Sequence, residues 1–348
     1  MATEGGIGEQ TGSIKIGGIS ETMIIGNKEH RIQLEMAMAS AITRNSALPH
    51  MIFVGAPGCG KTSTARRLAE ESGFPFLSVV PDSFKDYKSV IKILNQLNHE
   101  NYDDKGNRIG IIKPSILFVD EIHRMPVKGQ ELLGLAMERF IIESDKPNRF
   151  LWVPLFTLVG ATTLSGELTK PFLSRFKIRL TFEPYSLEDM IKIVRVHAKA
   201  KGLLLTPSAV SNVAGRARGT PRVAVGYLDS VRDRMVATGA TIATNYLVDV
   251  VFKQMGIDEN GVTATEMKIL KCLLNAGGPV GLDNLCIFTD EDRRTVREDI
   301  EPFLIKKGLL VVGGKGRTIT EKGIAYIENA GKCDKFIKKE IDFDYERV

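Results

Sequence analysis

The chain has 348 residues, a length at which two or three domains are typical and a core of useful size is readily buried. Hydrophobic residues make up 43% and charged residues 26% of it, as in soluble globular proteins, so wholesale disorder is excluded. A formal net charge of +5 permits an anionic partner without requiring one. The four cysteines form no CxxC pair and the amino terminus has no signal-peptide pattern, so we expect a cytoplasmic protein.

Composition along the chain predicts three domains between two tails. Residues 1–18 are polar and glycine-rich, which favours a flexible tail. From 19 to 183, apolar runs alternate with helical patterns, which predicts an α/β domain with a mostly parallel sheet. Residues 184–258 show helical patterns only and predict a helical lid domain. Residues 259–332 predict three helices followed by a hairpin, the order of a winged helix, and a charged tail at 333–348 follows.

Five apolar runs are the expected strands of the sheet. They occupy residues 51–54, 74–80, 115–119, 156–160 and 178–182. The most apolar stretch, 150–161, contains Pro154 and is too short to span a membrane, so it predicts a core strand with Trp152 in the core. Residues 98–113 carry turn residues and charges, which predicts an exposed insertion.

The strongest motif is GAPGCGKT at 55–62, which fits GxxxxGK[ST] between an apolar run and a helical pattern. Glycines let backbone N–H groups close around phosphates, and the start of the following helix favours their negative charge. We expect Lys61 to bind the β- and γ-phosphates of ATP and Thr62 to bind Mg²⁺. The residues expected to bind nucleotide in this loop are Gly55, Gly58, Gly60, Lys61, Thr62 and Ser63.

Polar side chains follow two further strands, where the carboxyl ends of a parallel sheet meet. We expect Asp120 to hold Mg²⁺ and Glu121 to polarise the water that attacks the γ-phosphate. Either Thr162 or Thr163 would bond the same water or the phosphate, and the spacing does not tell which. Helix capping is the alternative function of these threonines.

Two arginines are candidates for the γ-phosphate. Arg175 lies at the rim of the nucleotide domain, and an arginine supplied to a neighbouring subunit raises phosphoryl-transfer rates about 10³- to 10⁵-fold. A local ion pair is its alternative function. Arg222 follows Thr220 and Pro221, which suit a helix N-cap and first position, so its cation stands where the helix dipole disfavours it. A nearby phosphate would resolve that conflict.

The third domain carries candidate DNA contacts. Thr289 and Asp292 resemble a capping box that starts a helix with Arg293 near its beginning. Lys315 and Arg317 occupy the glycine-rich hairpin tip, where small residues let the backbone approach a phosphate chain. We expect these three cations to bind the DNA backbone without reading bases. A solvated charged surface is the alternative.

These residues resemble a known family, the RuvB-type Holliday-junction branch-migration motors of the AAA+ ATPases, over residues 26–327. The segments that carry the resemblance are DEIHRM at 120, FTLVGATT at 156, LSRF at 173, ARGTPRVA at 217, GGPVGLDNL at 277 and EPFLIKKGLL at 301. The resemblance implies a hexameric ring around duplex DNA, with ATP bound between subunits. By position it implies Thr163 as sensor 1, Arg175 as a finger acting in trans, Arg222 as sensor 2, Tyr185 as a nucleotide contact and Arg317 as a DNA contact.

The expected function is an ATP-driven ring that moves duplex DNA and drives branch migration of four-way junctions. Residues 141–155 look shortened where family members carry a hairpin that grips RuvA, so the chain is expected to use a RuvA-like partner, a different partner or none. Two alternatives stay open. One is a clamp-loader-like or initiator-like AAA+ switch that loads a partner on DNA, and the other is a DNA-binding regulator whose nucleotide site only controls assembly.

Overall fold

The computed structural model describes seven stretches of the chain, which divide by their contacts into two compact units. The described residues are 26, 28–97, 101–102, 108–109, 113–143, 150–163 and 165–330. Residues up to Gly202 together with Ala217–Leu228 form the first unit, and Leu203–Arg216 together with the chain from Asp229 onward form the second. The expected tails and most of the insertion at 98–113 lie outside the described residues. The expected domain boundaries stay a prediction, because the division by contacts runs through the expected lid.

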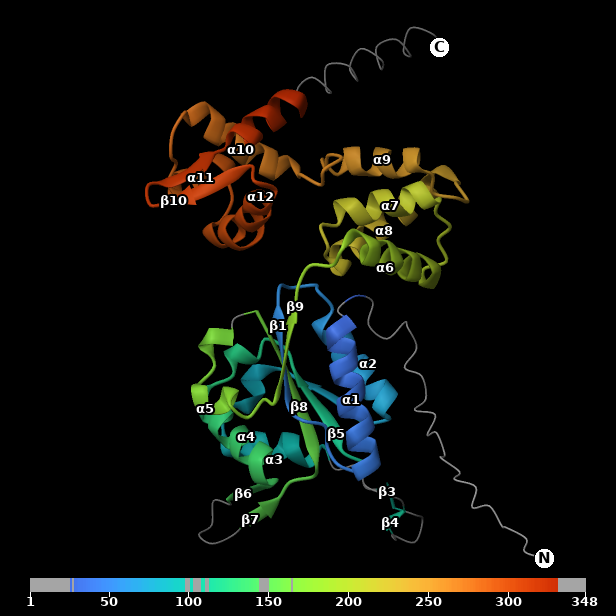
Figure 1. Ribbon diagram of the computed structural model, residues 1–348, viewed down its shortest axis with the longest axis vertical. Coiled ribbons are helices and arrows are strands. Elements are labelled where there is room, and N and C mark those ends of the chain that lie inside the picture. The colour runs from blue at the N-terminus through green and yellow to red at the C-terminus, as the bar shows by residue number, and fades with distance from the viewer. Residues whose placement is uncertain are drawn as a thin grey trace, which may run out of the picture. The chain divides into compact units, whose positions relative to one another are not determined.

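A five-stranded parallel sheet forms the centre of the first unit (Figure 1), as the apolar runs predict. Its strands are β1 (Met51–Gly55), β2 (Phe76–Val79), β5 (Ser115–Val119), β8 (Phe156–Thr162) and β9 (Ile178–Phe182), in the order β2-β5-β8-β1-β9. Every residue of the inner strands β5 and β8 is buried, whereas the edge strand β9 alternates between buried and exposed residues. The inner strands therefore show the unbroken apolar runs of a sheet that is covered on both faces.

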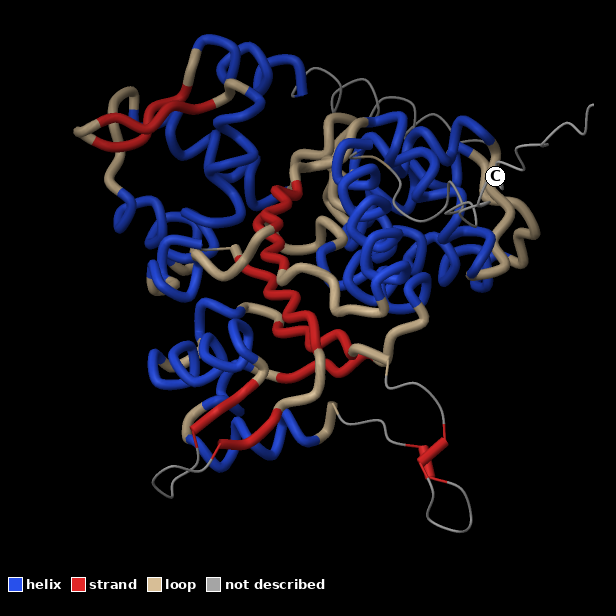
Figure 2. The backbone as a smooth tube through the Cα atoms, turned by 60° about the horizontal axis from the view of Figure 1, so that its bottom comes forward, coloured by secondary structure: helices blue, strands red, loops and turns tan. Residues whose placement is uncertain are grey.

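Helices cover both faces of this sheet (Figures 1 and 2). They are α1 (Lys28–Arg44), α2 (Lys61–Ser72), α3 (Tyr87–Asn95), α4 (Val127–Arg139) and α5 (Lys170–Leu173), with short turns η1 (Pro81–Phe84), η2 (Ile122–Arg124) and η3 (Ser165–Glu167). Alternate residues of a strand point to opposite faces. Met51 and Phe53 of β1 accordingly pack with α1 and α2, whereas Ile52 packs with α3, α4 and α5. The fold class predicted from the sequence, α/β with a parallel sheet, is confirmed.

The stretch 150–161 is not one core strand. Its first part, β7 (Phe150–Trp152), pairs antiparallel with β6 (Ile141–Glu143) outside the sheet, and β8 begins only after Pro154. Trp152 is 80% exposed, so its predicted place in the core is wrong. Alternate residues of a strand point to opposite faces, so Ile142 of this hairpin is buried in the core, whereas Trp152, which pairs with Ile141, lies on the other face and stays uncovered. A second small hairpin joins β3 (Asn101–Tyr102) to β4 (Arg108–Ile109), and no helix in the described ranges is long and apolar enough to cross a membrane.

The second unit ends in the predicted winged helix. The second unit begins with α7 (Pro207–Arg216) and α9 (Asn245–Gln254). The winged helix that follows consists of α10 (Ala264–Ala276), α11 (Leu282–Thr289), the π-helical segment η4 (Thr295–Ile300), α12 (Glu301–Lys307), β10 (Leu310–Gly313) and β11 (Gly316–Ile319). The strands β10 and β11 form the antiparallel wing, and apolar residues of α10, α11, η4 and α12 form one core with it. Two further helices, α6 (Leu187–Ala200) in the first unit and α8 (Pro221–Thr238) across both, complete the described helical segments.

The expected capping box at Thr289 is wrong. Thr289 is the last residue of α11, and its hydroxyl donates to the Leu285 carbonyl. Asp292 alone caps the following helix, because its carboxylate accepts from the N–H groups of Arg294 and Thr295. A left-handed residue, Asp290, ends α11 between them, so Thr289 cannot reach the next helix start.

A buried histidine makes the stability of the first unit depend on pH. His50 Nδ1 accepts from the Leu158 N–H at 2.9 Å, which leaves Nε2 to donate to the Met137 carbonyl at 3.1 Å. Burial lowers the pKa of His50 to about 4. The unfolded chain takes up this proton near pH 6.5, so the folded state loses stability as pH falls below that value, and the loss levels off near pH 4. The full effect is about 3 kcal/mol.

We expect His50→Gln to remove this pH dependence, because an amide can accept and donate in the same way without titrating. Chemical unfolding should show that the free energy of unfolding falls between pH 7.5 and pH 5 by about 2 kcal/mol more in the natural protein than in the variant. Equal losses in both proteins would contradict a buried, neutral His50.

Candidate functional site

The loop between β1 and α2 needs glycine for two separate reasons. Gly58 and Gly60 have φ angles of 78° and 90°, in the left-handed region that other residues rarely adopt. A Cβ on Gly58 would lie 2.9 Å from Arg222 Cβ, and one on Gly60 would lie 3.0 Å from the Tyr185 hydroxyl. The α2 helix begins immediately at Lys61, so its first N–H groups and its dipole are available to an anion at the loop.

Lys61 is held inside this loop. Lys61 is only 6% exposed, and its ammonium donates to the carbonyls of Gly55 at 2.7 Å and Ala56 at 3.0 Å. Burial lowers the pKa of Lys61, and the nearby carboxylates of Glu121 and Asp120 oppose that shift. Both direct partners are neutral, and a phosphate would make a stronger, charge-assisted hydrogen bond with the same ammonium.

Strand pairing brings the acidic residues to the loop. Val54 of β1 lies opposite Thr162 of β8, and Val119 of β5 lies opposite Gly160, so the three strands end side by side. Asp120 follows directly, and its carboxylate accepts from the Thr62 hydroxyl at 3.4 Å. Hydroxyl and carboxylate oxygens are the ligands that Mg²⁺ prefers, and this ion usually keeps several waters. Thr62 and Asp120 therefore fit a magnesium ion.

Glu121 has an unusual backbone and two side-chain neighbours. Its φ of 48° is left-handed, a conformation that costs energy for residues other than glycine and is frequent at active sites. The Thr163 hydroxyl donates to its Oε2 at 3.4 Å, whereas the Thr162 hydroxyl bonds His123 Nδ1 at 2.9 Å. Thr163 is therefore the threonine that contacts Glu121. His123 Nδ1 also lies 3.3 Å from Glu121 Oε2, a contact that the spacing of DEIHRM did not predict.

A cavity of about 340 Å³ lies within the first unit and collects these groups. Its lining residues are Pro57, Gly58, Gly60, Lys61, Thr62, Ser63, Asp120, Glu121, His197, Pro221, Arg222 and Val225. Arg222 comes from the first turn of α8, as predicted. His197 of α6 was not predicted as a site residue, because nothing in the helical sequence pattern around it distinguishes it. Tyr185 lies beside the loop, and burial raises its pKa to about 12, so its hydroxyl stays protonated.

Arg175 does not line this cavity. It follows α5, donates to the Pro171 carbonyl and lies 3.4 Å from the Glu138 carboxylate of α4. Its Nε is buried without a hydrogen-bond partner among the described residues. The Arg175 guanidinium can therefore donate to a further acceptor. An exposed ion pair such as that with Glu138 contributes little to stability on its own.

The expected DNA contacts differ in how their charges are compensated. Arg317 makes a bidentate ion pair with Glu301, at 2.6 and 3.2 Å, and both side chains are nearly buried. Arg293 is 68% exposed and paired with Asp283, and Lys315 is exposed at the tip between β10 and β11. The winged helix thus presents Lys315 and Arg293 outward, while Arg317 ties the wing to α12.

Three family models match the chain in sequence order. They are the Holliday junction DNA helicase RuvB P-loop domain at 20–182, the RuvB AAA lid domain at 185–258 and the RuvB C-terminal winged helix domain at 259–328. The chain belongs to the RuvB family. The cavity described above lies at the phosphate-binding loop of the region that matches the RuvB P-loop model, and the region that matches the lid model adds His197, Pro221, Arg222 and Val225.

Individual RuvB proteins agree with this assignment. The Holliday junction branch migration complex subunit RuvB of Orientia tsutsugamushi is 32% identical over 311 residues, covering 87% of this chain and 91% of that protein. The RuvB subunit of Streptococcus thermophilus is 34% identical, with 87% and 89% covered. The solved structure of the Thermotoga maritima RuvB Holliday junction branch migration motor superposes with a TM-score of 0.71 at 31% identity, covering 87% of this chain and 95% of that one.

Proposed function

We propose that this chain is an ATP-driven motor for branch migration of Holliday junctions. The observation that carries the proposal is the single cavity in which Lys61, Asp120, Glu121 and Arg222 meet, in a chain whose three parts match RuvB models in order. A clamp loader or initiator is not favoured, because the match to RuvB continues through the winged helix. A regulator without turnover is not favoured either, because the cavity contains a carboxylate suited to activate water.

ATP is the substrate of this site. Lys61 and the start of α2 bind its phosphates, and Arg222 contacts the γ-phosphate from α8. Glu121 orients and polarises the attacking water, with Thr163 holding the carboxylate in place. Mg²⁺, held by Thr62 and Asp120, would offset the charge of the phosphates. Tyr185, beside Gly60, packs against the bound nucleotide.

Completion of the site by a neighbouring subunit implies a ring. Arg175 does not line the cavity of its own protomer, and its Nε is buried with no hydrogen-bond partner in the part of the chain that the structure describes, which supports its function as a finger in trans. A residue given by each subunit to the next produces a closed ring when the rotation closes. We propose a hexamer that encircles duplex DNA in the cytoplasm.

The winged helix would hold the DNA backbone. Arg293 and Lys315 present their charges outward, and Arg317 would join them where a phosphate replaces Glu301 as its partner. Contacts of this kind carry affinity without sequence preference.

The β6–β7 hairpin supports a RuvA-like partner. Trp152 is 80% and Leu151 39% exposed on it, and exposed tryptophans are frequent anchors of protein interfaces. We expect Trp152→Ser to weaken binding of a RuvA-like junction-binding protein at least about tenfold, measured by calorimetry, with ATP turnover of the isolated protein unchanged. Trp152→Phe is the control and should keep most of the affinity. Equal affinity of the serine variant would exclude the hairpin as the contact.

The function is tested on a four-way junction with fluorescent arms. With ATP, the protein and its RuvA-like partner should separate the arms at a rate that depends on ATP concentration, and ADP should support no separation. ATP hydrolysis on the junction without any separation of arms would favour a loader over a motor.

A further inference from the structure

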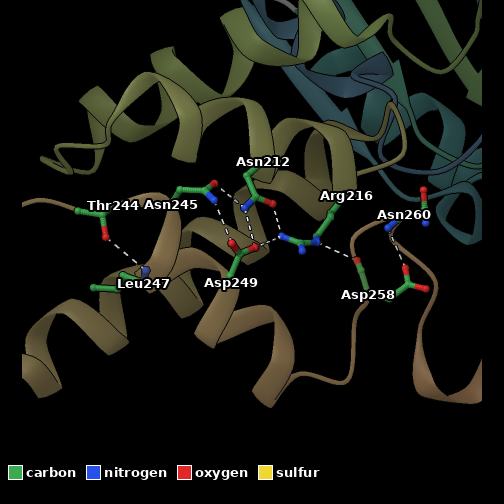
Figure 3. Close-up of polar contacts among 8 residues, drawn as sticks. All are labelled: Asn212, Arg216, Thr244, Asn245, Leu247, Asp249, Asp258 and Asn260. Carbon is green, nitrogen blue, oxygen red and sulfur yellow. Dashed lines mark hydrogen bonds and ion pairs between the residues drawn. The ribbon is translucent and has the colours of Figure 1, made fainter. Parts of the chain in front are cut away.

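A buried arginine joins three parts of the second unit (Figure 3). Arg216, the last residue of α7, donates through Nε to the Asp258 carbonyl at 2.8 Å. Its Nη1 lies 2.9 Å from the Asp249 carboxylate of α9 and also donates to the side chain of Asn212. Its guanidinium lies over the Phe252 ring, 4.5 Å from the ring centre. One side chain thus ties α7 and α9 to the segment that follows α9.

That segment is the connection from α9 to α10, where the winged helix begins. The Asp258 carboxylate folds it into a turn by accepting from the N–H groups of Asn260 at 2.9 Å and Val262 at 2.8 Å. The same carboxylate accepts from the hydroxyl of Tyr326, in the helical residues 321–330 near the carboxyl end. Burial and the Asp258 carboxylate raise the pKa of Tyr326, so this hydroxyl remains a donor.

The connection is packed as well as bonded. Gly261 has a φ of 80°, and a Cβ there would lie 3.0 Å from the Arg216 carbonyl, so the turn sits directly on the end of α7. Ile257 and Val262, on either side of the turn, are buried. A loose linker would show neither feature. Helices α7 and α9 and the winged helix therefore meet at a rigid joint whose centre is Arg216.

Arg216 is also the last residue of the second unit before the chain enters the first unit. The next residues, Ala217–Leu228, belong to the first unit and include Arg222, which lines the nucleotide cavity. Between them, Arg218 and Gly219 have left-handed φ angles of 57° and 75°, and the Gly219 carbonyl accepts from the Tyr185 N–H at 2.9 Å. Only five residues thus separate the proposed γ-phosphate contact from the joint.

We propose that Arg216 is a positioning residue that couples ATP hydrolysis to DNA movement. By clamping α7, the Asp258 turn and the Tyr326 helix into one body, it makes a displacement of residues 217–222 carry the winged helix with it instead of bending the connection. This inference rests on the proposed motor function. It assigns no contact with ATP or DNA to Arg216 itself.

Two variants weaken the clamp to different degrees. Arg216→Met keeps an unbranched side chain and removes the charge and every hydrogen-bond donor, whereas Tyr326→Phe removes only the hydroxyl that donates to the Asp258 carboxylate. Arg232→Met is the matched control, because the contacts of Arg232 with described residues are exposed ion pairs with Asp229 and Asp233 in the same unit. Tyr326→Phe decides the question if the methionine variant of Arg216 does not fold.

The first measurement is the number of junction steps per ATP hydrolysed. We expect both clamp variants to hydrolyse ATP within about twofold of the natural rate while the steps per ATP fall at least about fivefold, the low end of a typical coupling between sites. A purely structural role would lower hydrolysis and stepping together. Unchanged steps per ATP, or a parallel loss of both, would overturn the proposal.

The second measurement needs neither ATP nor DNA. Spin labels introduced as unnatural amino acids at Ser208 in α7 and at Glu321 report the distance between α7 and the winged helix in the full chain. The distribution should be narrow in the natural protein and in Arg232→Met, and broader in both clamp variants. Equal distance distributions in all four proteins would overturn the clamp, whether or not the natural protein moves DNA. A natural protein that moves no DNA would refute the motor function instead.

Discussion

Replacing Glu121 by glutamine is expected to lower ATP turnover about 10²- to 10⁴-fold while ATP binding is kept. The amide has nearly the size of the carboxylate and can still accept from the Thr163 hydroxyl. It lacks the negative charge that polarises the attacking water. Lys61, Thr62 and the loop remain, so the nucleotide should bind as before. Steady-state turnover and calorimetric ATP affinity, measured on the same preparation, test both halves of the expectation.

Glu167→Gln is the control for this change. Its carboxylate lies 3.9 Å from His123 Nε2 but outside the lining of the cavity, and it is largely exposed. We expect turnover close to that of the natural protein. A similar loss in both variants would mean that the local field around His123, rather than water activation by Glu121, controls the reaction.

The same Glu121 variant separates a motor from a regulator. A protein whose nucleotide site only controls assembly should keep its activity on DNA when hydrolysis stops, because ATP still binds. A motor should stall on the junction with ATP bound. Retention on labelled junction DNA without movement of the arms is the expected result.

Arg175→Ala is expected to reduce turnover about 10³-fold in the assembled protein, although Arg175 does not line the cavity of its own protomer. The reason is that its guanidinium would stabilise charge on the γ-phosphate bound to the adjoining subunit. ATP affinity should change much less than turnover, because this stabilisation is strongest in the transition state.

Mixing two inactive variants tests whether the arginine acts in trans. An Arg175→Ala subunit keeps Glu121, and a Glu121→Gln subunit keeps Arg175, so an interface with the right order contains both groups. Random mixing at equal amounts should restore activity at about a quarter of the interfaces. No recovery on mixing would assign Arg175 to its own protomer.

The ion pair with Glu138 offers an independent check on Arg175. Glu138→Gln removes the local partner, 3.4 Å away, and leaves the arginine in place. We expect turnover within about twofold of the natural rate, since an exposed pair contributes little to stability. A loss as large as that of Arg175→Ala would show that the residue acts through the local pair.

Predictions from the sequence succeeded where a local pattern has a local cause. The five apolar runs became the five parallel strands because strands buried on both faces leave unbroken apolar sequence. The loop at 55–62 follows β1 and precedes α2, as its glycines require. Arg222 was found through Pro221 and the helix dipole, and it does line the cavity. Its contact with phosphate stays a prediction.

Predictions failed or stayed open where a contact joins distant segments. Trp152 lies in an apolar stretch and is nevertheless 80% exposed, because it is on the face of the β6–β7 hairpin opposite the buried Ile142. Nothing in the spacing told Thr162 from Thr163, since the difference lies in which of them contacts His123 and which contacts Glu121. Arg317 was expected on DNA, and its buried partner Glu301 is sixteen residues earlier in the chain.

Local patterns in the amino-acid sequence predict the strands of the sheet, the phosphate-binding loop and the likeness to RuvB, because hydrophobic period, glycine and proline positions and short motifs act over a few neighbouring residues. The folded structure was needed to show which charges are compensated, which aromatic side chain is left uncovered, and that Arg216 joins α7 and α9 to the connection that leads to the winged helix. These depend on pairs of groups far apart in the chain, whose energies arise only when folding brings them within contact distance and removes water from around them.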